Sequence, residues 1–140
     1  MDFEKLLETR NLKNKFDRHV GIQITKMQVG YAKGEINIAD HHVNIIRSVH
    51  GGCIFSLADT VAGSAAVSHG ELVTTVSANI NYLSPAIGVK KLAAEAVEIK
   101  YGKNISVYDV SISDENEKLI AKGTFSYYNL KTSAESIWSN

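Results

Sequence analysis

One long helix with a centre of small residues dominates the pattern of this sequence. The stretch from Gly51 to about His69 reads as this helix, with Ser48 as a candidate cap and Gly70 in the position typical of a C-terminal glycine. About twenty helical residues span roughly 30 Å. Residues 62–66 read Ala-Gly-Ser-Ala-Ala, and such small side chains let a helix axis approach a sheet closely. The pattern equally fits an ordinary buried helix, and the two interpretations are compatible.

The rest of the chain indicates one more helix and six strands. Residues 2–16 carry a loose apolar stripe typical of a helix, and residues 40–48 are polar without a clear period, which indicates a loop. Segments rich in Val, Ile, Thr and Tyr, or alternating in polarity, predict strands at 19–29, 31–39, 73–83, 92–101, 105–113 and 119–128. Short turn-like links favour antiparallel hairpins. The order predicts an α+β class, with one helix against a single sheet of five or six antiparallel strands.

Composition limits the class of protein. The 140 residues fit a single domain, 1–140, with a tail from about 131 to 140 that is expected to fray. Fifteen basic residues balance fifteen acidic ones, which gives no electrostatic case for binding nucleic acid or an anionic membrane surface. The single cysteine, Cys53, suits a reducing compartment. The N-terminus lacks the pattern of a signal peptide and no run is long enough to span a membrane, so we expect a cytoplasmic protein.

The clearest chemistry lies at the start of the long helix. Gly51 and Gly52 stand where the helix begins, and the first N–H groups of a helix lack internal partners and lie at the positive end of its dipole. An oxygen can approach such N–H groups unhindered, as stabilising a tetrahedral oxyanion requires. Asp59 adds a carboxylate two turns further on. Together these groups are the minimum for hydrolysing an ester or thioester, although a tight turn and a solvated acid are the ordinary alternatives.

The spacing of these two groups predicts an assembly. Asp59 follows Gly51 by eight residues, which is about 12 Å along a helix axis. A base or nucleophile must lie within ~3 Å of the reacting group or its water. Gly51 and Asp59 of one helix therefore cannot easily serve the same carbonyl carbon. Two antiparallel helices from two subunits would solve this geometry, with Gly51 of one facing Asp59 of the other, and a two-fold dimer would contain two equivalent sites.

Further motifs accompany these residues and extend the pattern. They are Asn44, His50-Gly51-Gly52, Phe55, Leu57-Ala58-Asp59, Gly63, Thr75-Val76-Ser77, the Ile-Asn-Tyr-Leu-Ser-Pro-Ala run at 80–86 and Ala-Lys-Gly-Thr at 121–124. With them the chain resembles the hotdog-fold thioesterases, most closely the PaaI-like (phenylacetate-degradation) branch, from about residue 19 to 129. The resemblance implies a central helix wrapped by the sheet, hydrolysis of an acyl- or aryl-acyl-CoA, and a composite site at a dimer interface.

The resemblance also implies a role for each matching residue. The Gly51 N–H binds the thioester carbonyl oxygen, and Asn44 helps to polarise that carbonyl or to orient the substrate. Asp59 activates water or attacks the carbonyl carbon directly, and the sequence does not separate these two routes. Ser77 holds the attacking water or the carboxylate. Strict alternation of the strand, however, places Ser77 on the face opposite Val76 and Ala78.

The remaining expectations concern neighbouring groups and partners. Gly52 and His50 are expected at the substrate, with His50 mainly bracing the turn. A Cys53–His50 pair has no other support in the sequence. The spacing of His41, His42, His50 and Asp59 as metal ligands fits no usual zinc pattern. The resemblance implies no metal, no cofactor apart from the coenzyme A of the substrate, and a dimer that further associates into a tetramer. The identity of the acyl group stays open.

Other functions use the same fold. The main alternative is a non-catalytic protein that binds acyl-CoA or an acyl carrier, against which Asp59 argues. A hydratase would pair an acid with a histidine, and the next histidine after Asp59 is His69, near the helix end. A ligand-sensing regulator would need a DNA-binding segment, for which the first helix is too short.

Overall fold

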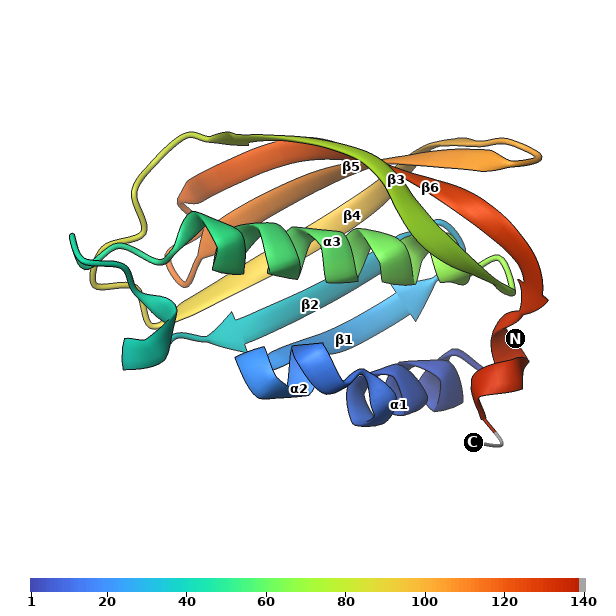
Figure 1. Ribbon diagram of the computed structural model, residues 1–140. Coiled ribbons are helices and arrows are strands. Elements are labelled where there is room, and N and C mark those ends of the chain that lie inside the picture. The colour runs from blue at the N-terminus through green and yellow to red at the C-terminus, as the bar shows by residue number, and fades with distance from the viewer. Residues whose placement is uncertain (139–140) are drawn as a thin grey trace.

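A computed structural model describes residues 1–138 as two layers, in which a six-stranded antiparallel sheet curls around one long helix (Figure 1). The helices are α1 (Phe3–Lys13), α2 (Lys15–Val20) and α3 (Gly51–Val67). The strands are β1 (Ile22–Gln28), β2 (Tyr31–Asn37), β3 (Glu71–Tyr82), β4 (Lys91–Tyr101), β5 (Ile105–Asp114) and β6 (Leu119–Ser133). Short 3₁₀ turns lie at Asp40–His42 and Ala134–Ile137. The predicted α+β class is confirmed, and the sheet has the larger of the two expected strand numbers.

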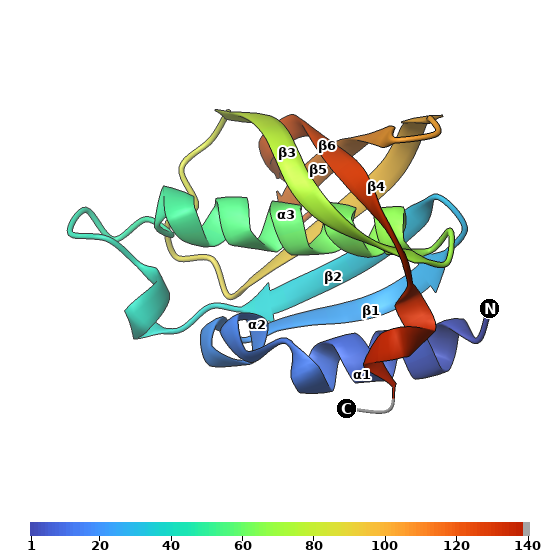
Figure 2. The same cartoon turned by 45° about the vertical axis from the view of Figure 1, so that its right-hand side comes forward.

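The core lies between α3 and the concave face of the sheet. The strand order is β1-β2-β4-β5-β6-β3, and α3 crosses the middle of this sheet (Figure 2). Leu57 and Val61 of α3 are fully buried against inward-facing residues such as Ile112. The helix lies so close to β2 that a Cβ atom at Gly34 would sit 2.6 Å from Cγ2 of Val61. A glycine on the strand, as well as small residues on the helix, therefore sets the closeness of the two layers.

The ends of α3 differ in part from the prediction. The N-cap is His50, whereas Ser48 lies two residues earlier in a β-bridge with Ile87, so the prediction of Ser48 as cap was wrong. The helix ends at Val67, and Gly70 takes a left-handed conformation with φ of 100° and donates its N–H to the carbonyl of Val67 at 2.8 Å. This confirms the predicted C-terminal glycine.

The N-terminal segment forms two helices where one was expected over residues 2–16. Asn14 separates them, because its extended backbone ends α1 and its side chain accepts the Asp17 N–H to cap α2. Asn favours such cap positions over helix interiors because its side chain competes for backbone donors. Gly21, with φ of 100°, then ends α2, so β1 begins at Ile22 rather than at residue 19.

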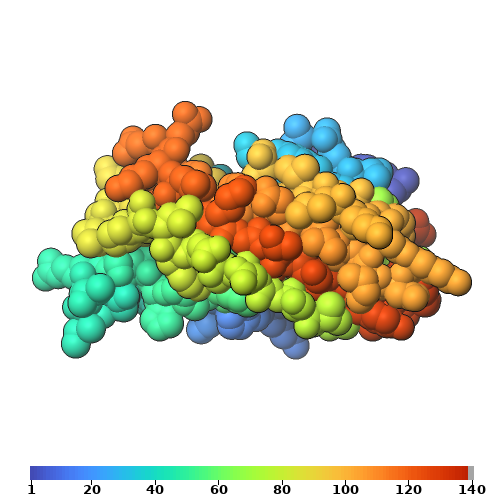
Figure 3. Space-filling model, turned by 90° about the horizontal axis from the view of Figure 1, so that it is seen from above, coloured from blue at the N-terminus to red at the C-terminus, as the bar shows by residue number. Residues whose placement is uncertain are grey.

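One edge strand of the sheet, β1, is covered by a helix, whereas the other, β3, is open. At the β1 edge, α1 covers the strand, and the Asn11 amide accepts the Ile24 N–H at 2.7 Å and donates to the Ile24 carbonyl at 2.8 Å. At the other edge, β3 pairs only with β6 among the strands of residues 1–138. Figure 3 shows β3 as a band beside β6, with the loop that precedes α3 projecting at one end. The longer edge is therefore the open one.

The C-terminal segment is more ordered than the expected fraying from residue 131. Strand β6 continues to Ser133 and is followed by a 3₁₀ turn in which Ala134 is fully buried. The Lys13 ammonium donates to the carbonyl of Ile137 at 2.6 Å, which ties this turn to α1. The last two residues of the predicted tail, 139–140, lie outside the described residues. No helix in the described part of the chain has the length and apolar character that crossing a bilayer requires.

Candidate active site

The first turn of α3 leaves one backbone donor without an acceptor. The Gly52 N–H donates to Nδ1 of His50 at 2.8 Å, and the Cys53 and Ile54 N–H groups donate to the His50 carbonyl at 2.9 and 3.2 Å. Within residues 1–138, the Gly51 N–H has no hydrogen-bond acceptor. The carbonyl of Gly51 accepts the Tyr82 hydroxyl at 2.8 Å. Of the two glycines, only Gly51 can therefore offer its N–H to a ligand, since that of Gly52 is engaged by His50.

A cavity of about 300 Å³ opens beside this turn. It lies between the loop before α3 and the segment that follows β3, and its lining includes Asn44, Gly51, Tyr82 and Pro85. A Cβ atom at Gly51 would lie 3.4 Å from the Tyr82 ring, so the missing side chain keeps this wall of the cavity clear. The predicted pairing of Asn44 and Gly51 at one place is thus present in the structure.

The side chain of Asn44 is occupied by its own loop. Its Oδ1 accepts the N–H groups of Ile46 and Ser48 at 3.1 and 3.2 Å, and its Nδ2 donates to the Ser48 hydroxyl at 2.9 Å. One proton of Nδ2 is left over, because an amide nitrogen carries two. Asn44 therefore shapes the loop, which includes Arg47 with a positive φ of 66°, and can direct at most that second proton toward a substrate.

Asp59 is held by two hydroxyl groups. Its Oδ1 accepts the hydroxyl of Thr75 at 2.8 Å and that of Tyr127 at 2.8 Å, and the Tyr127 hydroxyl also lies 2.9 Å from the Asp59 carbonyl oxygen. The carboxylate lines a second cavity, of about 230 Å³, together with Gly63, Thr75 and Tyr127. Burial, and then the nearby Asp59 charge, raise the pKa of Tyr127, so this phenol stays a hydrogen-bond donor at neutral pH.

Ser77, which the resemblance expects at the attacking water or the carboxylate, makes no hydrogen bond to Asp59 of its own subunit within residues 1–138. A β-bulge between Thr75 and Ser77 interrupts the strict alternation of β3. Ala78 and Ile80 pack toward the core, whereas Ser77 is exposed and pairs with Ser126. The bulge brings Thr75 to the helix side of the strand, so Thr75 holds the carboxylate of its own subunit.

Two further charged residues, Arg10 and Asp17, lie near Asp59. Nε of Arg10, from α1, donates to the Ser64 hydroxyl at 2.9 Å, and Asp17, from α2, accepts the Thr60 hydroxyl at 2.8 Å. Burial lowers the pKa of Arg10, against the opposing influence of Asp17, Tyr127 and Asp59. Burial also raises the pKa of Asp17, against the Thr60 hydrogen bond and Arg10. The site thus contains one half-buried cation, Arg10, beside the carboxylates of Asp17 and Asp59.

The two halves of the predicted site do not meet within one subunit. Gly51 and Asn44 line the first cavity and Asp59 lines the second, and the two cavities have no lining residue in common. Asp59 follows Gly51 by eight positions along α3, a rise of about 12 Å. A single subunit therefore presents the free Gly51 N–H without the Asp59 carboxylate in one cavity, and the Asp59 carboxylate without the Gly51 N–H in the other.

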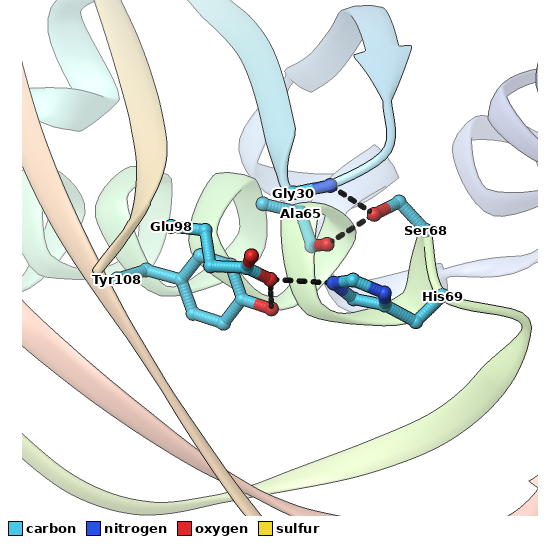
Figure 4. A network of polar contacts seen from close by, with 6 residues as sticks. All are labelled: Gly30, Ala65, Ser68, His69, Glu98 and Tyr108. Carbon is cyan, nitrogen blue, oxygen red and sulfur yellow. Dashed lines mark hydrogen bonds and ion pairs between the residues drawn. The ribbon is translucent and has the colours of Figure 1, made fainter. Parts of the chain in front are cut away.

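The other candidate groups have different surroundings. Burial raises the pKa of the Cys53 thiol, the opposite of what a nucleophile needs. At the far end of α3, Nε2 of His69 lies 2.5 Å from Oε1 of Glu98, and Ser68 ties the helix to Gly30 (Figure 4). The His69 ring also stacks on Tyr101. No group of three or more His, Cys, Asp or Glu side chains among the described residues is arranged to hold a metal ion.

Three residues of this site were not predicted. They are Thr75, Tyr127 and Arg10, and each comes from an element far from Asp59 in the sequence. A β-bulge leaves no clear signal in a single sequence, so Thr75 was hidden by the assumption of strict alternation. Tyr127 lies on β6, where its inward orientation depends on the register with β3. Arg10 reads as an ordinary charge of an amphipathic helix.

Comparisons with known proteins agree with this fold. Residues 47–121 match the family described as the thioesterase superfamily. A candidate esterase of Archaeoglobus fulgidus is 39% identical over 104 residues, which cover 73% of this chain and 68% of that protein. The acyl-coenzyme A thioesterase PaaI of Escherichia coli is 33% identical over 73% of each chain. The solved structure of the Escherichia coli PaaI protein superposes with a TM-score of 0.85 at 26% identity, covering 95% of this chain and 99% of that one. The predicted hotdog fold is therefore confirmed.

Proposed function

The chain belongs to the thioesterase superfamily, and from that premise we propose that it hydrolyses an acyl- or aryl-acyl-CoA thioester to the free acid and coenzyme A. The observation that carries the proposal is the presence, on one helix, of a free backbone donor at Gly51 and a hydroxyl-held carboxylate at Asp59. The Escherichia coli relative is by name an acyl-coenzyme A thioesterase, which supports a thioester as the bond that is broken.

The proposed site is composite. If two subunits joined antiparallel along the open edge of β3, their sheets would continue across a two-fold axis, and their α3 helices would lie antiparallel on the same side. Gly51 at the start of one helix would then approach Asp59 near the middle of the other. The contrast between the covered β1 edge and the open β3 edge supports this choice of interface. A tetramer of two such dimers is a further expectation, which comes from the family resemblance alone.

In this arrangement the roles divide as follows. The Gly51 N–H, at the positive end of the helix dipole, binds the carbonyl oxygen and stabilises the oxyanion that forms when the carbon is attacked. Asp59 of the other subunit either takes a proton from water, whose hydroxide adds to the carbon, or adds to the carbon itself to give a mixed anhydride that water then cleaves. In both routes the C–S bond breaks, and the thiolate of coenzyme A leaves and takes up a proton. Asn44 shapes the loop beside the carbonyl.

The test is release of thiol from a panel of acyl-CoAs, with phenylacetyl-CoA, hexanoyl-CoA and palmitoyl-CoA as representatives. We expect turnover of some members by the wild type and a loss of at least about 10²-fold in Asp59→Ala, because this residue takes part in the chemistry. Asp109→Asn, which changes an exposed carboxylate paired with Lys122, is the matched control and should keep its activity. EDTA should have no effect, since no step requires a metal.

Two outcomes would contradict the proposal. Full activity in Asp59→Ala would remove the carboxylate from the mechanism. Binding of the acyl-CoAs to the wild type without any turnover would favour the alternative function, a protein that binds acyl-CoA or an acyl carrier without catalysis.

A further inference from the structure

The carboxylate of Asp59 has two oxygens with different surroundings, and this difference identifies a residue that acts through Asp59. Oδ1 accepts two hydroxyl groups, from Thr75 and Tyr127, each at 2.8 Å. Within residues 1–138, no hydrogen bond reaches Oδ2. We propose that Tyr127 is the positioning residue of the site: with Thr75 it fixes Oδ1 and leaves Oδ2 as the oxygen that reacts. This inference rests on the proposed thioester hydrolysis.

The two hydroxyls converge because of the sheet register. Thr75 of β3 and Tyr127 of β6 are direct cross-strand partners, so their side chains leave the sheet side by side toward α3. The short threonine and the long tyrosine then reach the same oxygen from two directions. A carboxylate oxygen accepts about two such bonds, so Oδ1 is saturated by the pair. The rotation of the carboxylate about its last bond is thereby fixed.

Tyr127 is itself firmly held. Its side chain is 2% exposed, and its ring packs edge-on against Tyr108 at a centroid distance of 6.0 Å. The ring also lies close to α3, since a Cβ atom at Gly63 would be in van der Waals contact with it at 3.5 Å. A hydroxyl on such a fixed ring is a rigid reference point for the carboxylate, and positional errors of about 1 Å can cost 10²-fold in rate.

The donors to Asp59 are neutral, which matters for its chemistry. No ion pair to Asp59 is formed in the described part of the chain. The charged groups that surround it are Arg10 from α1 and Asp17 from α2, while β3 and β6 contribute the two hydroxyls. A cation in direct contact would hold the carboxylate in place but would also weaken it as a base or nucleophile. Two hydroxyls orient it and leave its charge in place.

A purely structural role for Tyr127 is the competing explanation, because its hydroxyl also lies 2.9 Å from the Asp59 carbonyl oxygen and so fastens β6 to α3. The chain offers matched controls for separating the two roles. Tyr128, the next residue of β6, and Thr124, a threonine of the same strand, are both exposed and lie outside the cavity that Asp59 lines. The experiment therefore compares Tyr127→Phe with Tyr128→Phe, and Thr75→Val with Thr124→Val.

Three quantities are measured for each variant: kcat and KM on the most active acyl-CoA among phenylacetyl-CoA, hexanoyl-CoA and palmitoyl-CoA, the melting temperature, and the carbon-13 resonance of the Asp59 carboxyl group. That resonance is assigned as the one missing from Asp59→Asn. We expect Tyr127→Phe to lower kcat about 10- to 100-fold with KM changed less than about 2-fold. We also expect it to move the Asp59 resonance. Thr75→Val should act in the same direction, and the two controls should match the wild type.

The outcomes separate the inference from the proposed function. A wild type that cleaves no thioester overturns the proposed function, and the Asp59 resonance then still decides whether Tyr127 holds the carboxylate. An active wild type with an equally active Tyr127→Phe and an unmoved resonance overturns the inference alone. Loss of activity in proportion to a loss of melting temperature, in all four variants alike, would assign Tyr127 a structural role and would also overturn it.

Discussion

Nδ1 of His50 accepts the N–H of Gly52 at 2.8 Å, and this single bond determines which backbone donor is left at the start of α3. The His50 carbonyl accepts the next two N–H groups of the helix. His50 thereby provides acceptors for the N–H groups of Gly52, Cys53 and Ile54 in the first turn of the helix, and only the Gly51 N–H of that turn is left without an acceptor. His50, which the resemblance expects mainly to brace the turn, is the N-cap of α3 in the structure.

The cap predicts how His50 variants behave. His50→Ala should lower the free energy of unfolding by about 1 kcal/mol, because the Gly52 N–H loses its acceptor, whereas His50→Asn should keep most of that energy, since asparagine is a good N-cap. Urea unfolding at one protein concentration, with an unchanged m-value, measures both. Equal stability of His50→Ala and the wild type would mean that the cap contributes nothing.

Gly51 gives a direct test of the free donor. Proline is tolerated at the first helical position because the N–H there has no intrahelical partner, so Gly51→Pro should fold while losing the donor. We expect kcat to fall about 10²- to 10³-fold, the usual effect of removing an oxyanion donor. Gly51→Ala keeps the N–H and brings its Cβ to about 3.4 Å from the Tyr82 ring, so it controls for added bulk. Equal activity of the two variants would rule out the donor role.

A composite site predicts complementation between two inactive variants. In a dimer of Gly51→Pro with Asp59→Asn, one site has both defects and the other has neither. Unfolding and refolding an equal mixture gives half heterodimers at random, so about a quarter of the wild-type activity should return. The measurement is thiol release before and after co-refolding, with each variant refolded alone as control. No recovery, despite mixed dimers detected by native mass spectrometry, would place both groups of each site in one subunit.

The buried Asp17 predicts a pH dependence of stability. Burial raises the pKa of Asp17 above its usual value of 3.8. The folded state therefore binds this proton more tightly than the unfolded state, and the resulting stability is present below about pH 3.8 and is lost as the pH rises through the raised value. Asp17→Asn keeps an acceptor for Thr60 without titrating. Urea unfolding from about pH 4 to about pH 7 should show the wild type losing stability relative to this variant. A trend in the opposite direction would contradict the raised pKa.

The single thiol should be slow to react. Burial raises the pKa of Cys53, so at about pH 8 its thiolate fraction is lower than that of a free cysteine. We expect iodoacetamide to modify the folded protein more slowly than glutathione, and unfolding in urea to abolish the difference. The extent of alkylation is read by mass spectrometry. Equal rates for the folded and unfolded chain would show that Cys53 is accessible and unperturbed.

The sequence was a good guide where periodicity and local chemistry decide the structure. The long helix, the antiparallel strands and the position of Gly51 at a helix start all follow from patterns within a few residues of each other. Asn14 shows the limit of this approach, because one polar residue in an otherwise helical pattern became a break between two helices. The caps depend on which side chain the backbone turn brings close, and for that reason His50 rather than Ser48 caps α3.

The residues that surround Asp59 were harder to predict from the sequence, because they are brought together by the register of strands far apart in the chain. One extra residue in β3, at the bulge beside Val76, decides whether Thr75 or Ser77 faces the carboxylate. Tyr127 lies 68 residues from Asp59 and meets it only through the pairing of β3 with β6. Such non-local pairing leaves no periodic trace in one sequence.

The unpaired edge of β3 also has a consequence for the newly folded subunit, which is its tendency to aggregate. Along the twelve residues of β3, the backbone N–H and C=O groups that point away from β6 are open to any extended chain nearby, and such edges are where aggregation begins. The exposed threonine, serine and asparagine side chains along this strand make it less prone to aggregation than an apolar edge. A newly made subunit nevertheless keeps this edge until something covers it. Whether the subunit escapes aggregation then depends on how soon another subunit covers this edge, and therefore on the concentration of the protein.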